Sequence, residues 1–108
     1  MARKYDLISE LYNRTCKTVV SNPQNWQAFL ASACRNYKLR YDEQLLVYAQ
    51  RPDATAVLEI EQWNKIFGRW VNRGARGIAV FADENRTRQR LTHYFDTSDT
   101  HESRYSRT

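Results

Sequence analysis

The chain has 108 residues, a hydrophobic fraction of 42% and a formal net charge of +5. A chain of this size suits one domain that can bury a real apolar core. No apolar run in the chain reaches the length of about 18 residues that a membrane-spanning helix needs. Its first residues lack the apolar stretch of a secretory signal. We therefore expect a cytoplasmic protein without a membrane partner.

Three helices are predicted in the first half of the chain. Apolar residues recur at helical spacing over residues 5–20. A cleaner apolar stripe follows; Ser21 or Asn22 can cap this helix, and Pro23 suits its first position. The third helix covers residues 42–51 and stops there because proline follows.

The second half changes in character. The stretch "TAVLEI" is short and β-branched, which favours a strand or an extended segment over residues 55–60. A helix of about two turns should follow over residues 60–67 and end at Gly68 in the left-handed conformation. Two more strands are expected over residues 78–82 and 91–95, joined as a hairpin by the polar loop "DENRTRQR".

This order predicts an α+β fold, with three N-terminal helices and one short later helix packed on a small antiparallel sheet. We expect one domain over residues 1–100, and a flexible tail or the start of a linker over residues 101–108. Each element has one apolar face that needs covering. The residues expected to share one core are Trp26, Phe29, Leu30, Leu45, Leu46, Trp63, Phe67, Ile78, Val80, Leu91 and Phe95.

The sequence shows no pattern of a metal, cofactor or catalytic site. Cys16 and Cys34 fall at apolar helical positions, which favours buried free thiols over a disulfide. His93 alternates with Leu91 and Phe95, which is more typical of a structural histidine than of a ligand. The segment "DTSDTH" places its polar residues along one strand exit, where they favour local turn hydrogen bonds over a triad. We expect no enzyme, cofactor or small-molecule substrate.

The positive charge is concentrated in one quarter of the chain. Residues 65–90 hold seven basic and two acidic residues, an excess that equals the net charge of the whole chain. Such a concentration attracts a polyanion better than evenly spread charge. Arginine guanidinium groups can donate paired hydrogen bonds to phosphates, and unpaired bases can stack on aromatic rings. Trp70 and Tyr94 lie close to these arginines in the predicted fold. The alternative is that Trp70 packs in the core and the arginines only solubilise two short strands.

The stretch "GRWVNRGARGIAVF", residues 68–81, sits at the centre of this charge. Its "GARG" resembles the G-x-x-G loop of KH domains, but it leads into a strand instead of joining two helices. Gly74 and Gly77 should form a tight turn with exposed backbone N–H groups. The arginines of this turn and of the hairpin loop should lie at opposite ends of the sheet. Tyr94 should face away from the core between them.

Three segments together resemble a known family. They are "NWQAFLASACRNYKLRYDEQLLVYAQRPDAT", "WNKIFGRWVNRGARGIAVF" and "LTHYFDTSDT", which cover roughly residues 25–100. The resemblance is to the N-terminal, ArdC-like domain of DNA-processing proteins of conjugative elements and phages, in the version found in clostridial helicase–methyltransferase polyproteins. It implies binding of single-stranded DNA in proteins that protect or process incoming DNA. Residues that match the family's basic turn are Arg69, Trp70, Asn72, Arg73, Gly74, Arg76 and Gly77; Arg51 matches its basic position before proline, and the family often has lysine in place of Arg76.

We therefore expect a non-catalytic single-stranded DNA-binding module of a mobile-element DNA-processing or antirestriction protein. The alternative is a docking module that binds partner proteins, among them downstream helicase- or methyltransferase-type domains of the parent chain. The residues expected to bind nucleic acid are Arg51, Arg69, Trp70, Arg73, Gly74, Arg76, Gly77, Arg86, Arg88, Arg90 and Tyr94.

Overall fold

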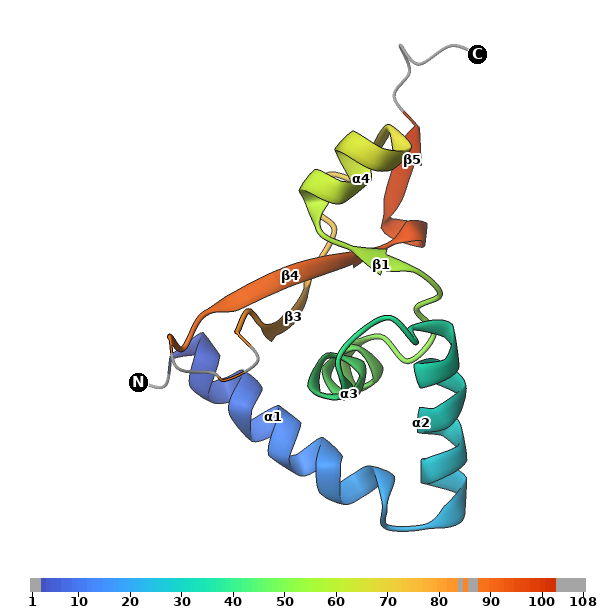
Figure 1. Cartoon of the computed structure of the whole chain (residues 1–108), viewed down its shortest axis with the longest axis vertical. Helices are drawn as coiled ribbons and strands as arrows, with labels where there is room; N and C mark the ends of the chain where they lie inside the picture. Colours follow the sequence, from blue (N-terminus) through green and yellow to red (C-terminus); the bar gives the residue numbers. More distant parts are fainter. Residues whose placement is uncertain (1–2, 84, 86–87, 103–108) are drawn as a thin grey trace.

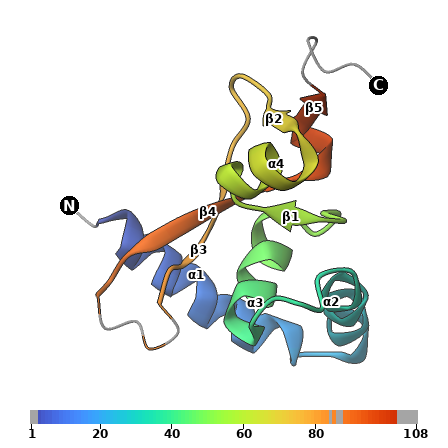
Figure 2. The ribbon, with the colours of Figure 1, turned by 45° about the horizontal axis from the view of Figure 1, so that its top comes forward.

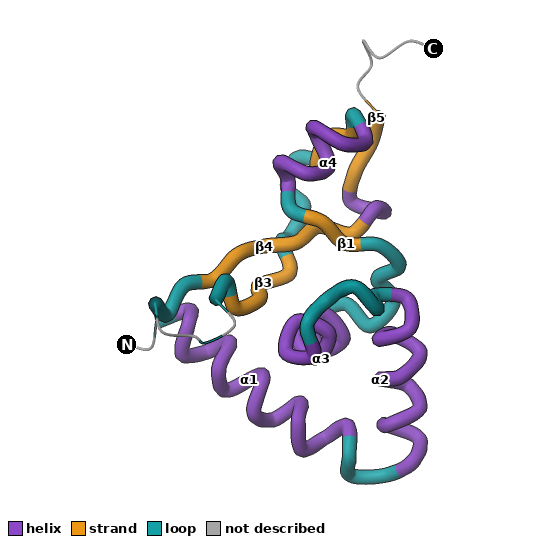
Figure 3. The backbone as a smooth tube through the Cα atoms, in the orientation of Figure 1, coloured by secondary structure: helices purple, strands orange, loops and turns teal. Residues whose placement is uncertain are grey.

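A computed structural model describes residues 3–83, 85 and 88–102 of the chain. It has the predicted α+β fold, with helices and a small antiparallel sheet (Figures 1 and 3). The helices are α1 (Lys4–Val19), α2 (Pro23–Arg35), α3 (Tyr41–Gln50) and α4 (Ile60–Phe67). The strands are β1 (Val57–Leu58), β2 (Arg69–Val71), β3 (Ile78–Phe81), β4 (Leu91–Asp96) and β5 (Thr100–Glu102), and a 3-10 turn, η1 (Thr97–Asp99), precedes β5.

The strands form two separate antiparallel sheets. The first has the order β1-β4-β3, with Leu58 opposite Phe95 and Ile78 opposite Tyr94. The second pairs β2 with β5, and the sequence did not predict it. Figure 1 shows α1, α2 and α3 on one side of the first sheet, while α4 and β5 lie at the opposite end of the molecule. Because β5 extends to Glu102, the last strand ends two residues beyond the expected boundary at residue 100; residues 103–108 lie outside the described part.

Local signals set several helix ends as predicted. Pro23 occupies the first turn of α2, and the Asn22 side chain accepts a hydrogen bond from the Asn25 N–H at 2.8 Å. Gly68 ends α4 in the left-handed conformation, with φ of 62°, which is a conformation that glycine adopts without a Cβ penalty.

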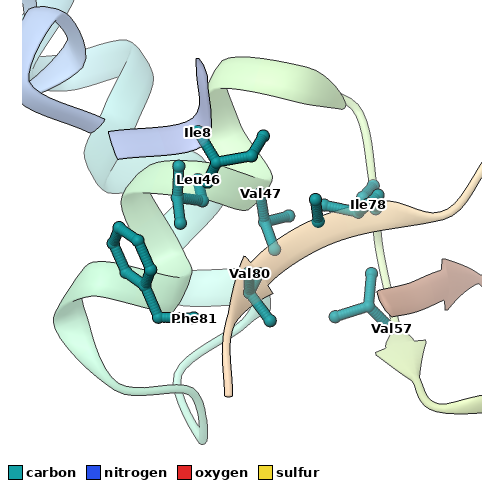
Figure 4. Packing of buried hydrophobic residues seen from close by; sticks show 9 residues of the cluster. Ile8, Leu46, Val47, Val57, Ile78, Val80 and Phe81 are labelled. Carbon is teal, nitrogen blue, oxygen red and sulfur yellow. The ribbon is translucent and has the colours of Figure 1, made fainter. Parts of the chain in front are cut away.

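The main core lies between α1, α3 and the first sheet. Figure 4 shows Ile8 of α1 and Leu46 and Val47 of α3 packing against the apolar side chains of β3 and β1. All four residues of β3 are buried. The rings of Tyr5 and Tyr12 on α1 contact that of Phe81, with centroids 5.4 and 5.6 Å away.

The expectation of one shared core was wrong. Val19, Phe29 and Leu45 form a second cluster between α1, α2 and α3. On α2, Trp26 and Leu30 are 37% and 41% exposed, because this helix packs mainly against α3 and α1 and only its Phe29 side is covered. Phe67 of α4 is also exposed. Cys34 is exposed and Cys16 is half-buried, so the expected burial of both thiols was wrong, while both are free thiols as expected.

Two side chains from the α3 region bond to the outer edge of β3. The Gln50 amide donates to the Ala79 carbonyl at 2.8 Å and accepts from the Ala79 N–H at 3.0 Å. The Arg40 guanidinium donates to the Phe81 carbonyl at 2.8 Å. The open edge of this apolar strand is thereby satisfied by side chains instead of another strand.

Candidate nucleic-acid interface

The connection between β2 and β3 is an anchored turn, residues 72–77, that carries two exposed arginines. Figure 2 shows it looping out beside α4 and β2 before it reaches β3. Gly74 has a φ of 83°, and the Ala75 N–H donates to the Asn72 carbonyl at 3.1 Å. Arg73 and Arg76 are exposed, and neither makes an ion pair or hydrogen bond with any residue that the structure describes.

The base of this turn is held by polar bonds to the second sheet. The Asn72 N–H donates to the Asp99 carbonyl at 2.7 Å, and His101 Nδ1 donates to the Asn72 side-chain oxygen at 2.6 Å. Within β2, Arg69 donates to the hydroxyl and carbonyl oxygens of Thr100 at 2.7 and 2.9 Å. The turn is therefore fixed at its root while its arginines project into solvent.

Gly77 serves a different purpose from Gly74. A Cβ at Gly77 would lie 2.9 Å from the Cβ of His93 on β4, which is closer than real Cβ contacts. The absence of a side chain thus lets the end of the turn approach the outer face of β4. Gly74, by contrast, has open space around it and is suited by its positive φ.

Trp70 is 43% exposed on β2, opposite His101 of β5. The alternative placement of Trp70 in the core is therefore wrong. Trp70 precedes the turn that carries Arg73 and Arg76 by two positions in the sequence, so a partly exposed aromatic ring lies close to this turn.

A second group of basic residues gathers at the far end of β3 and β4. Arg88 and Arg90 are exposed there, while Arg86 lies outside the described residues. The N-terminus of α1 joins them: Arg3 donates to the Gln89 side chain at 2.5 Å, and Lys4 Nζ lies 3.0 Å from His93 Nε2 (Figure 1). Sequence reasoning missed this contribution, because the contacts join residues more than eighty positions apart.

His93 connects the two basic ends. Its ring lies against Gly77 on one side and accepts a hydrogen bond from Lys4 on the other. Partial burial and the Lys4 charge lower the pKa of His93, so the ring is neutral at pH 7. His93 therefore has packing and hydrogen-bond partners within the fold.

Arg51 is held by the acidic residues that follow β4. Its guanidinium donates to Asp99 at 2.7 Å and to the Ser98 hydroxyl at 3.1 Å. Its nitrogens also lie 3.6 Å from Asp53 and 3.8 Å from Asp96. The hydrogen bond to Asp99 raises the pKa of Arg51 despite partial burial. This cation is largely neutralised within the fold, although it lines a small hollow of about 260 Å³ together with Arg76.

Asp96 ties the two segments "RPDAT" and "DTSDT" together. Its carboxylate accepts hydrogen bonds from the Thr55 and Ala56 N–H groups at 2.9 and 3.1 Å and from the Ser98 hydroxyl at 2.6 Å. Burial acts to raise the pKa of Asp96, but the bonds from Ser98, Ala56 and Thr55 outweigh it and lower that pKa. Both segments thus serve the fold, and the polar residues of the second make the local turn bonds that the sequence predicted.

Tyr94 does not face away from the core, so this expectation was wrong. It packs against the main core, and its hydroxyl donates a short hydrogen bond to Glu43, which is 5% exposed. Burial and this bond raise the pKa of Tyr94. Tyr94 and Asp96 are two positions apart on β4, so their side chains lie on the same face of the strand, the one turned towards α3. We therefore leave Tyr94 out of the candidate interface.

Within the described ranges, no group of three or more histidine, cysteine, aspartate or glutamate side chains could hold a metal ion. A search of the same residues for a helix long and apolar enough to cross a bilayer finds none. No family model matches the chain, and comparisons with curated proteins and with solved structures find no match either.

Proposed function

We propose that the chain is a non-catalytic module that binds single-stranded DNA. The observation that carries the proposal is a difference between two pairs of arginines. Arg40 and Arg51 are paired with carboxylates close to the core. Arg73 and Arg76 instead project from an anchored turn with no carboxylate partner among the described residues. Unpaired, exposed guanidinium groups attract phosphates, because nothing in the fold competes for them.

The two basic ends flank a strand of suitable length. A strand of six residues such as β4 is about 20 Å long at about 3.3 Å per residue. The 72–77 turn and the group of Arg88, Arg90 and Lys4 can therefore contact the backbone of a few nucleotides. Trp70 adds an exposed aromatic face beside the turn, and such faces stack on bases without regard to sequence.

The wider setting follows from the family resemblance. The module would act in the cytoplasm, within a DNA-processing or antirestriction protein of a mobile element. Downstream helicase- or methyltransferase-type domains of a parent chain would be its neighbours. Free thiols at Cys16 and Cys34 agree with a reducing compartment.

The docking-module alternative is favoured by a different surface. Trp26 and Leu30 lie one helical turn apart on α2 and are both partly exposed, although they are large apolar residues. An apolar surface of this kind suits a protein partner. Its binding would be insensitive to salt, whereas phosphate contacts release counterions and weaken steeply as salt increases.

A titration of labelled oligonucleotides tests the proposal. Fluorescence anisotropy would be measured with single-stranded DNA, duplex DNA and RNA at several salt concentrations. We expect Arg73→Ala with Arg76→Ala to weaken single-strand binding and to reduce the log–log salt slope by about 0.7 for each lost phosphate contact. The charge-matched control is Arg14→Ala with Lys17→Ala, which changes two exposed cations of α1. Equal affinity of both double variants, with intact circular dichroism, would contradict the proposal.

A further inference from the structure

A cleft of about 490 Å³ lies between the α2–α3 connection, the β1 segment and α4. Its lining includes Trp63 and Phe67 of α4, whose ring centroids are 5.5 Å apart. Tyr37 and Leu39 of the α2–α3 connection and Val57 and Leu58 of β1 line it as well. The lining of the cleft is thus largely apolar and includes aromatic rings from two separate segments.

The charged residues that line the cleft are all cations. They are Arg35, Lys38 and Arg69, and no carboxylate is found among the lining residues that the structure describes. Arg35 is anchored on the carbonyl oxygens of Ala54 and Pro52 at 3.1 and 2.7 Å. Arg69 is anchored on Thr100, as described above. Because these partners are neutral oxygens, both guanidinium groups are held in place without a carboxylate that compensates their charge.

Two of the three aromatic residues that line the cleft are exposed and so open to a ligand. Tyr37 is 71% exposed and Phe67 is 57% exposed, whereas Trp63 is buried, with its indole N–H donated to the Phe95 carbonyl at 2.8 Å. Lys38 Nζ lies 5.9 Å from the centre of the Tyr37 ring. A flat, apolar ligand that carries negative charge fits such a site, and an unpaired nucleotide is a ligand of this kind.

We infer that the cleft receives one unstacked base of a bound single strand, which contacts Tyr37 and Phe67 while its flanking phosphates meet the three cations. The inference rests on the proposed function and adds a base-binding site that the sequence did not indicate. Arg69 links the two surfaces, because it lines the cleft and begins β2, which leads into the 72–77 turn. At three residues, β2 spans about 10 Å, so one short strand of DNA can contact both.

Photocrosslinking to the whole chain identifies which side chains contact the bases of a bound oligonucleotide. The probe is oligothymidylate that carries 5-iodouracil, which crosslinks to nearby aromatic rings, followed by peptide mapping. We expect crosslinks at Tyr37 or Phe67. Crosslinks confined to Trp70 would overturn the cleft inference and leave the proposed function standing. Absence of any binding to the oligonucleotide would overturn both.

Affinity measurements provide the second readout. Tyr37→Ala should weaken single-strand binding roughly 5- to 150-fold, the equivalent of about 1–3 kcal/mol for one stacked base, with little change in the salt slope. The control is Tyr41→Ala, which removes a tyrosine that is 52% exposed and does not line the cleft. Since Tyr37 is largely exposed, its variant should fold. Unchanged affinity of Tyr37→Ala overturns the inference, even where Arg73 and Arg76 prove essential. Equal losses in both tyrosine variants would do the same.

Discussion

Replacing Tyr94 with phenylalanine removes one hydroxyl from the interface between β4 and α3. That hydroxyl donates to Glu43, a buried carboxylate near the start of α3. Glu43 keeps two other partners in the variant: the Arg40 N–H at 2.9 Å and the Arg40 guanidinium, whose Nη1 lies 3.8 Å away. The carboxylate therefore loses a donor without becoming isolated.

The cost follows from the charge of the acceptor. Hydrogen bonds to charged groups contribute about 1.5–3 kcal/mol, and loss of one partner exposes the desolvation penalty of the other. Because Arg40 still satisfies part of Glu43, we expect the lower end of this range, about 1.5–2 kcal/mol of unfolding free energy. Affinity for single-stranded DNA should not change, since Tyr94 faces the core.

Urea unfolding followed by circular dichroism measures this cost. With a urea slope of about 1–3 kcal/mol/M, the midpoint of Tyr94→Phe should fall by roughly 1 M. Tyr48→Phe is the matched control, because Tyr48 is half-buried and its hydroxyl has no hydrogen bond to a described residue. If both variants stay within about 0.5 kcal/mol of the parent chain, the role assigned to the Tyr94–Glu43 bond is wrong.

Three further changes test the contacts around β4. Gly77→Ala should destabilise the fold by about 1–3 kcal/mol in urea unfolding, because its new Cβ would overlap with the Cβ of His93; a neutral effect would contradict that close approach. The lowered pKa of His93 means that the unfolded chain binds its proton more readily. The contribution of His93 to the free energy of unfolding should therefore be fully present above the ordinary pKa of 6.5 and should decrease as pH falls below it. The variant His93→Gln should show a smaller decrease in this pH range. Asp96 also has a lowered pKa. Its contribution is present above the ordinary value of 3.8 and is lost as pH falls from there through the folded-state pKa, so Asp96→Asn should remove part of the acid limb of a stability–pH curve.

Local signals predicted the parts of the fold that depend on single residues. Pro23 and Gly68 marked helix ends correctly, because their backbone preferences act whatever surrounds them. The second sheet escaped prediction because β2 and β5 have three residues each, lie about thirty positions apart and show no apolar alternation. Their pairing depends on polar bonds such as that between Asn72 and Asp99, which no local pattern reveals.

For the candidate interface too, local features were predicted correctly, while a feature that depends on distant residues was not. The turn at Gly74 and the exposure of its arginines follow from composition, and the structure has both. The orientation of β4 was misjudged because apolar residues occur on both of its faces, with Phe95 on one and Tyr94 on the other. A strand with two such faces needs its neighbours to decide which one is covered, and here the deciding neighbour is Glu43 on a distant helix.

The pairing of the Gln50 amide with the backbone of Ala79 has a consequence for self-association. A short, wholly apolar strand with an open edge is a template on which a second copy can add its own strand, and this is how aggregates begin. By presenting one donor and one acceptor at the spacing of a peptide group, Gln50 occupies the place that an incoming strand would take. Because Gln50 is the last residue of α3, fraying of a single helical turn would expose the edge of "IAVF". Protection of the Ala79 part of this edge therefore depends on how well the end of α3 is held, and the Arg51 ion pairs fix the residue that directly follows it.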